Sequence, residues 1–324
     1  MPRFVVYGAG AVGGVLGSRL VEHGHEVVLI ARGAHRDAIV ASGLRFESPD
    51  GVLVQRIEVA GGPAELAWRE DDVVLLTMKS QDTVAALASL EAAAGPGIAV
   101  ACAQNGVENE RLALRRFERV YSVVVQLPCT HLVPGVVVAH SSPLTGSLDI
   151  GCHPDGGDAR AAEIAAVFSG CGFASEPRAD ISRWKYAKLL RNVANAVEAL
   201  FDDPPGAPEV RRRAAAEAAA TFAAAGIDHV ADDEYDERHA RLITIKPVAG
   251  QPRGGGSTWQ SLARASGVIE TDELNGEIVL LGRLHGVPTP VNELLRRTAG
   301  AAARAGAPPG GHGEADFLAA LGES

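Results

Sequence analysis

The chain has 324 residues, of which 47% are hydrophobic and 22% are charged, and its formal net charge is −10. This length allows a substantial core and a second domain, while the composition excludes an intrinsically disordered chain. The negative net charge excludes nucleic acid and anionic membrane surfaces as expected partners, because both would repel the protein by bulk electrostatics.

The four cysteines form no CxxC pair. This spacing excludes the common zinc motifs and a disulfide framework, and no His/Asp/Glu cluster has ligand spacing, so we expect no metal site. No uninterrupted apolar run approaches the ~18 residues that a membrane-spanning helix needs. The glycines near the N-terminus also interrupt the apolar segment that a signal peptide requires. We therefore expect a cytoplasmic protein with reduced thiols.

The first 120 residues alternate between predicted strands and predicted helices. Apolar, β-branched segments predict strands at residues 4–7, 25–32, 71–79 and 97–106. Helices are expected between and after them, at residues 11–23, near 34–42, after residue 79 and from about residue 108. A β-ribbon with a Pro-Asp-Gly turn is expected over residues 43–59. This alternation predicts a parallel sheet that is covered by helices on both faces.

The pattern changes after residue 120. Short strands are predicted at residues 120–127, 135–141 and 146–152, and we expect them to add antiparallel strands to the sheet. From about residue 179 the strand signal disappears and helices are predicted, the first of them over residues 181–200. We place a domain boundary near residue 178, which gives an α/β domain at 1–178 and an all-helical domain at 179–324.

A glycine motif joins the first predicted strand to the first predicted helix. Gly8, Gly10 and Gly13 have the spacing G-x-G-x-x-G, and Ala9, Ala11 and Val12 are the residues between them. In this context the first glycine allows a tight turn, the second allows close approach of a pyrophosphate, and the third allows close packing of helix on strand. The N–H groups that begin the helix can bind phosphate. A merely flexible turn is the alternative, but the motif favours a dinucleotide site.

The second predicted strand distinguishes between the two nicotinamide cofactors. An NAD site usually carries an acidic residue at the end of this strand, where it binds the ribose hydroxyls. Here Ala31 and Arg32 end the strand, and Glu26 lies at its opposite end. Because a guanidinium can pair with a 2′-phosphate, Arg32 favours NADP(H) over NAD(H), with an ordinary surface arginine as the alternative.

Two further polar residues follow predicted strands. Lys79 ends the third strand, and Asn105 lies in the turn after the fourth. Ligands of open parallel sheets bind beyond the carboxyl ends of the strands, so both side chains could line the nicotinamide cleft. Either residue alone would equally suit an ordinary turn.

A polar stripe is predicted on the first helix of the second domain. Lys188, Asn192 and Asn195 are spaced i, i+4 and i+7, which places them on one face of a continuous helix. Asparagine is a poor helix former, so two asparagines beside a lysine suggest a stripe that faces a cleft. A solvated helix face is the alternative, and the spacing alone does not decide between them.

Three polar residues near the C-terminal third have ordinary structural interpretations. Ser257 and Thr258 follow a run of glycines and resemble a helix N-cap, and Glu270 resembles an acid in the first turn of a helix. These residues gain a functional interpretation only from a wider resemblance.

The sequence resembles the ketopantoate reductases (2-dehydropantoate 2-reductases) through nearly its whole length. The resemblance is carried by GAGAVGG, the lysine of TMKSQ, QNGVENE, PGVVVAH, RWKYAKLLRNVANAVEAL and ETDELNGEIVLLGRLHGVPTPVN. It implies an NADP-binding Rossmann-type α/β domain followed by an all-α domain of the 6-phosphogluconate dehydrogenase C-terminal type.

The resemblance also implies a role for each candidate residue. The motif from Gly8 to Gly13 would hold the pyrophosphate and Arg32 the 2′-phosphate. Lys188 would be the catalytic proton donor, with Glu270 as the acid near the reacting centre. Contacts to substrate or cofactor are implied for the remaining polar residues, namely Lys79, Asn105, Asn192, Asn195, Ser257 and Thr258.

The expected activity is therefore NADPH-dependent reduction of 2-dehydropantoate to (R)-pantoate, on the route to coenzyme A, by a monomer or homodimer. Departures from the family pattern surround the substrate residues: the two asparagines are three residues apart rather than four, and residues 257–261 read STWQS. A relative that reduces a different 2-keto acid or keto-sugar acid is thus an alternative, and a non-catalytic NADP sensor is another.

Overall fold

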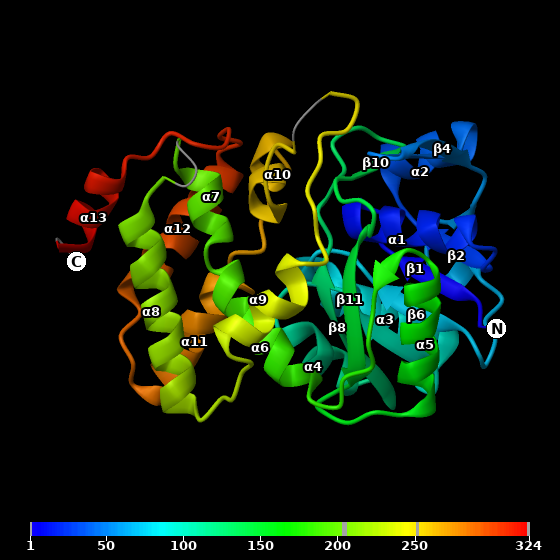
Figure 1. The fold of residues 1–324 in the computed structure, drawn as a ribbon, viewed down its shortest axis with the longest axis horizontal. Coiled ribbons are helices and arrows are strands. Elements are labelled where there is room, and N and C mark those ends of the chain that lie inside the picture. Colours follow the sequence, from blue (N-terminus) through cyan, green and yellow to red (C-terminus); the bar gives the residue numbers. More distant parts are fainter. Residues whose placement is uncertain (1, 203–205, 251–252, 323–324) are drawn as a thin grey trace. The chain divides into compact units, whose positions relative to one another are not determined.

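The computed structural model describes residues 2–202, 206–250 and 253–322. Its larger sheet, of which β1, β2, β6, β8 and β11 are labelled in Figure 1, has the strand order β12-β11-β8-β7-β6-β1-β2-β5. Neighbouring strands are parallel except β8 and β11, which are antiparallel. The strands are β1 (Phe4–Tyr7), β2 (Val27–Ile30), β5 (Glu58–Ala60), β6 (Val73–Leu76), β7 (Ala99–Cys102), β8 (Arg119–Gln126), β11 (Gly146–Cys152) and β12 (Phe173–Ala174). The predicted mainly parallel sheet is confirmed, and residues 146–152 add a strand that is antiparallel to β8. The expectation that residues 120–127 add an antiparallel strand is wrong, because β8 runs parallel to β7.

Helices cover both faces of this sheet, which explains why its central strands are apolar at every position. In β1, Val6 belongs to a core that includes Leu16 of α1 (Ala11–Glu22) and Phe168 of α5 (Ala159–Gly170). Its neighbour Val5 points to the other face and joins a core with Leu90 of α3 (Thr83–Ala94). Because successive side chains of a strand alternate between faces, a strand buried on both sides cannot show polar alternation.

A second sheet has the order β4-β3-β10-β9. Its strands are β3 (Leu44–Ser48), β4 (Gly51–Gln55), β9 (Cys129–Thr130) and β10 (Val136–Ala139). The β-ribbon expected over residues 43–59 is confirmed as the β3–β4 hairpin over residues 44–55, whereas residues 58 and 59 belong to β5 of the larger sheet. The expectation that residues 135–141 extend the main sheet is wrong, because β10 pairs with β3 and β9 instead. The physical reason lies in α1: Gly14 has no side chain, and an added Cβ would lie 2.5 Å from Val137 Cγ1, so β10 packs directly on this helix.

The C-terminal part is helical, as predicted. It contains α6 (Ile181–Asn192), α7 (Asn195–Leu200), α8 (Pro208–Ala225), α10 (Ser257–Ala263), α11 (Asn275–His285), α12 (Pro290–Arg304) and α13 (Glu314–Gly322). Apolar faces of six of these helices form one core, represented by Leu189, Phe222, Ile278, Leu295 and Phe317. The amphipathic spacing of these residues accounts for the helical prediction.

The described chain forms two compact units, and each unit is built from three separate segments of the sequence. The first unit comprises residues up to 104, 108–185 and 231–253, and the second comprises 105–107, 186–230 and the chain from 254 onward. The single domain boundary predicted near residue 178 therefore does not reproduce these two units. The segment that returns to the first unit contains α9 (Asp232–Ala240).

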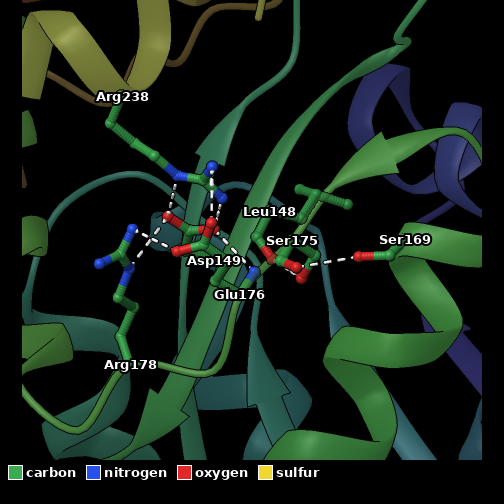
Figure 2. Close-up of polar contacts among 7 residues, drawn as sticks. All are labelled: Leu148, Asp149, Ser169, Ser175, Glu176, Arg178 and Arg238. Carbon is green, nitrogen blue, oxygen red and sulfur yellow. Dashed lines mark hydrogen bonds and ion pairs between the residues drawn. The ribbon is translucent and has the colours of Figure 1, made fainter.

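Asp149 of β11 anchors α9 to the first unit (Figure 2). Its carboxylate is fully buried and accepts hydrogen bonds from Arg238 Nε at 3.0 Å and Arg238 Nη2 at 2.6 Å. It also accepts from the backbone N–H of Glu176 at 2.9 Å and from Arg178 Nε at 3.4 Å. A bidentate guanidinium–carboxylate pair fixes both distance and orientation. This pair holds α9 against the sheet.

Candidate functional site

The glycine motif has the backbone that its spacing predicts. Gly8 has φ +106°, and an added Cβ would lie 2.6 Å from the backbone nitrogen of Met78. A Cβ on Gly13 would lie 2.3 Å from Gly8 O and 2.4 Å from Thr77 Oγ1. Around Gly10, in contrast, nothing lies within 4 Å of the added Cβ. Gly8 and Gly13 therefore serve internal packing, while Gly10 leaves space in which a ligand can approach the backbone.

The start of α1 presents hydrogen-bond donors beside this space. Gly10 is the N-cap and supplies no side-chain cap, so the N–H groups of Ala11, Val12 and Gly13 begin the helix without partners inside it. These donors and the helix dipole favour an anion. The residues present thus fit the pyrophosphate of a dinucleotide.

His35 holds the backbone of the glycine turn. Gly135 N donates to His35 Nδ1 at 2.9 Å, which leaves the proton on Nε2, and Nε2 donates to Ala9 O at 2.7 Å. Burial, helped by the charge of nearby His131, lowers the pKa of His35 to about 4. The imidazole is therefore neutral at physiological pH and supports one orientation of the Ala9 carbonyl.

Arg32 and Lys79 follow strands that are immediate neighbours of β1. Arg32 comes after β2, and its side chain is 72% exposed with an Asp82 oxygen 4.0 Å away. Lys79 is half-buried and comes shortly after β6. Since β6, β1 and β2 are parallel and adjacent, the structure brings the glycine turn, Arg32 and Lys79 to the same edge of the sheet.

The expected continuous helix over residues 181–200 is wrong. Helix α6 ends at Asn192, and α7 begins at Asn195 after two intervening residues. Lys188 and Asn192 remain one turn apart on α6, and both are buried. Asn195 is half-buried at the first position of α7, so it does not continue the α6 stripe through helical spacing.

The structure brings Ser257 and Glu270 together, although Ser257 is not a helix N-cap and Glu270 does not lie in the first turn of a helix. Gly256, not Ser257, is the N-cap of α10, and Glu270 precedes α11 by several residues. Ser257 Oγ donates to Glu270 Oε2 at 2.9 Å. Glu198 was not singled out from the sequence, yet it accepts from Gly256 N at 3.2 Å. The sequence signal that could have identified Glu198 is its position three residues after Asn195, because residues i and i+3 share a helix face.

Asn192 Oδ1 and Thr258 Oγ1 are among the buried polar atoms of the second unit for which the described residues provide no hydrogen-bond partner. Buried polar atoms are nearly always paired, so such atoms suggest a missing partner. Asn105, which belongs to the same unit, is half-buried and precedes Gly106, which has φ +81°. The second unit thus gathers most of the expected substrate residues.

Other site classes receive no support. In the described ranges no group of three His, Cys, Asp or Glu side chains is arranged to hold a metal ion. Among those same residues, no helix has the length and apolarity required to cross a bilayer.

Comparison with known proteins gives consistent matches over both units. The family model described as "Ketopantoate reductase PanE/ApbA" matches residues 4–155, and its C-terminal counterpart matches residues 180–302. A 2-dehydropantoate 2-reductase from Caulobacter vibrioides is 30% identical, with 94% of this chain and 100% of that protein covered.

Two solved structures extend the comparison. A PanE/ApbA family ketopantoate reductase from Ralstonia eutropha is 30% identical and has a TM-score of 0.77, with 94% of this chain and 99% of that chain covered. A D-mandelate dehydrogenase bound to NADH and anilino(oxo)acetate shares the fold, with a TM-score of 0.78, 21% identity, and coverage of 94% and 99%.

Proposed function

Because the chain belongs to the ketopantoate reductase family, we propose that it reduces 2-dehydropantoate to (R)-pantoate with NADPH, in the cytoplasm. The observation that carries the proposal is the pair of buried, unpartnered atoms Asn192 Oδ1 and Thr258 Oγ1. They occur in the unit that also contains Lys188 and Glu270. A hydroxylated keto acid can supply the hydrogen bonds that these atoms lack.

Lys188 is proposed as the proton donor. Bound NADPH supplies the hydride, and reduction of a ketone places negative charge on its oxygen. A buried ammonium stabilises such charge and can then transfer a proton from Nζ to the oxygen. The Glu270 carboxylate, oriented by Ser257 Oγ, balances the charge of the ammonium. Among the asparagines, Asn192 and Asn195 would bind the substrate without adding charge.

Arg32 is proposed to select NADPH over NADH. Within the described parts of the chain, the ion pair of its exposed guanidinium is a long one to Asp82, which favours its availability to a 2′-phosphate. The NADH-bound D-mandelate dehydrogenase shows that this fold also accepts the other cofactor. Lys79 and Asn105 would complete the contacts to cofactor and substrate.

The test is NADPH oxidation by the purified protein with 2-dehydropantoate. We expect Lys188→Ala to lower kcat by about 10²-fold or more, because a positioned acid commonly contributes this much. Lys246→Ala is the matched control, since Lys246 is an exposed lysine of the first unit. Absence of turnover, or a Lys188→Ala rate equal to that of the control, would refute the proposal.

A different 2-keto acid is the second candidate, and Glu198 is the observation that favours it. Its carboxylate binds Gly256 N beside Ser257, where it adds negative charge near the expected substrate residues. Ranking a panel of 2-keto acids by kcat/KM distinguishes the two candidates. A non-catalytic sensor would instead bind NADPH without turnover of any acceptor, and Lys188→Ala would leave its binding unchanged.

A further inference from the structure

Strand β4 forms an apolar edge of the second sheet. It ends the strand order, so one of its edges is open within the described parts of the chain. Val52, Leu53 and Val54 are 49%, 38% and 59% exposed. Natural edge strands are usually protected by charges, proline or short length, because an open edge can pair with another chain. Residues 51–55 contain neither a charge nor a proline.

The backbone hydrogen-bonding groups at this edge can be assigned from the pairing of β3. Arg45 lies opposite Val54 in the β3–β4 pair, but its N–H donates to Gly135 O at 2.9 Å, away from β4. Arg45 and Val54 are therefore a non-hydrogen-bonded pair. Such pairs alternate along an antiparallel ladder. The N–H and C=O groups of Val54 and Val52 thus point towards the open edge.

The sequence of this segment is complementary to itself in antiparallel orientation. Residues 50–56 read Asp-Gly-Val-Leu-Val-Gln-Arg, with Leu53 at the centre. Pairing two copies about Leu53 places Val52 opposite Val54 and Asp50 beside Arg56, twice by symmetry. Both charged residues are exposed. Antiparallel pairing about a two-fold axis is an isologous contact, in which opposite charges and apolar pairs each contribute.

We infer that β4 pairs with β4 of a second copy of this chain, which joins the two smaller sheets into one continuous eight-stranded sheet. Val52 and Val54 of both copies then form one apolar cluster on the outer face. A contact confined to one strand and its flanks is small, so the dimer is a weak one, with a dissociation constant in roughly the micromolar range. This inference does not depend on the proposed reaction.

The experiment is sedimentation velocity of the full chain over about 1–200 μM, a range that brackets a micromolar dissociation constant. Val54→Pro removes an edge-facing N–H without breaking a β3–β4 hydrogen bond, which an edge strand tolerates, and Val54→Thr retains that N–H as the matched control. We expect dimer formation by wild type and Val54→Thr, and a monomer for Val54→Pro. Circular dichroism and NADPH binding verify that each variant is folded.

A charge exchange tests the register. Arg56→Glu alone places like charges together, and we expect it to weaken dimerisation on the order of tenfold. Arg56→Glu combined with Asp50→Lys restores opposite charges and should restore the dimer. A monomeric wild type, a dimer that persists in Val54→Pro, or a double variant as weak as the single one would overturn the inference. Pairing of β4 with an unrelated peptide instead of a second copy would leave the wild type monomeric.

Discussion

Replacing Asp149 with asparagine is expected to destabilise the first unit strongly. Asp149→Asn keeps the size of the side chain but removes the negative charge that Arg238 and Arg178 share (Figure 2). It also places an NH₂ donor where hydrogen-bond donors already converge. The side chains of the two arginines are only 15% and 23% exposed, so water compensates them poorly.

The size of the stability loss depends on the charges that remain near the two arginines after the substitution. Removing one partner of a buried ion pair costs about 3–5 kcal/mol. Glu176 lies 3.0 Å from Arg238 Nη1 and 2.7 Å from Arg178 Nη2, and it still offsets part of the positive charge. We therefore take the lower limit, about 3 kcal/mol. For a unit of this size, each kcal/mol shifts Tm by roughly 2–4 °C, which gives a decrease of about 6–12 °C.

Differential scanning calorimetry at neutral pH measures this shift. The matched control is Glu237→Gln on the same helix, because the ion pair of Glu237 with Arg241 is exposed on both sides. Such a pair contributes little to stability. A difference of about 1 °C is near the error of the method. If the Tm values of Asp149→Asn and Glu237→Gln differ by no more than this, Asp149 does not anchor α9 and the reasoning is refuted.

Four further substitutions test the proposed dinucleotide site. Gly13→Ala should prevent correct packing, because its Cβ would lie 2.3 Å from Gly8 O. Gly10→Ala should instead fold normally and bind NADPH weakly. Thermal melts measure the first effect, and fluorescence titrations with NADPH measure the second. Arg32→Ser should raise KM for NADPH about tenfold, the value of one charge-assisted contact, with KM for NADH unchanged in the same assay. The pKa of His35 is about 4 in the folded protein and 6.5 when unfolded, so the unfolded chain binds the extra proton between these values. Stability should fall by roughly 2 kcal/mol as pH decreases from 6.5 to 4, and urea titrations of His35→Gln should lack that part of the pH dependence.

The features predictable from the sequence are those encoded by neighbouring residues. Segments such as Phe4–Tyr7 and Val73–Leu76 are short, rich in valine and apolar at every position, which favours strands buried on both faces. The glycine motif is equally local, because Gly8 and Gly13 are required by contacts within a few residues or with the adjacent strand. The residues whose roles rest on the family resemblance, such as Lys188 and Glu270, stay predictions.

Features that depend on distant contacts were not predictable. No helix was predicted over the polar residues of α9, and nothing in this segment indicates its partner, which is Asp149, 89 residues earlier. The interruption between α6 and α7 is similarly hidden, because apolar residues such as Leu189, Val193 and Leu200 continue a helical pattern across it. Periodicity indicates which side of a helix is buried, and it does not reveal a short interruption between two helices.

Lys185 and Lys188 show why spacing alone cannot assign function. They lie one turn apart on α6, yet Lys185 Nζ lies 2.8 Å from Glu110 Oε1 and donates to Gln104 O at 2.8 Å. Lys185 and Glu110 are both buried, so this ammonium already has the partners that a buried charge requires. The chain passes from the first unit to the second directly after Gln104 and directly after Lys185. The hydrogen bond of Lys185 to Gln104 O therefore fixes the chain at two of these crossings, immediately before Asn105 and one turn before Lys188. Spacing alone therefore does not distinguish the ion-paired Lys185 from Lys188, whose proposed role rests on the family resemblance.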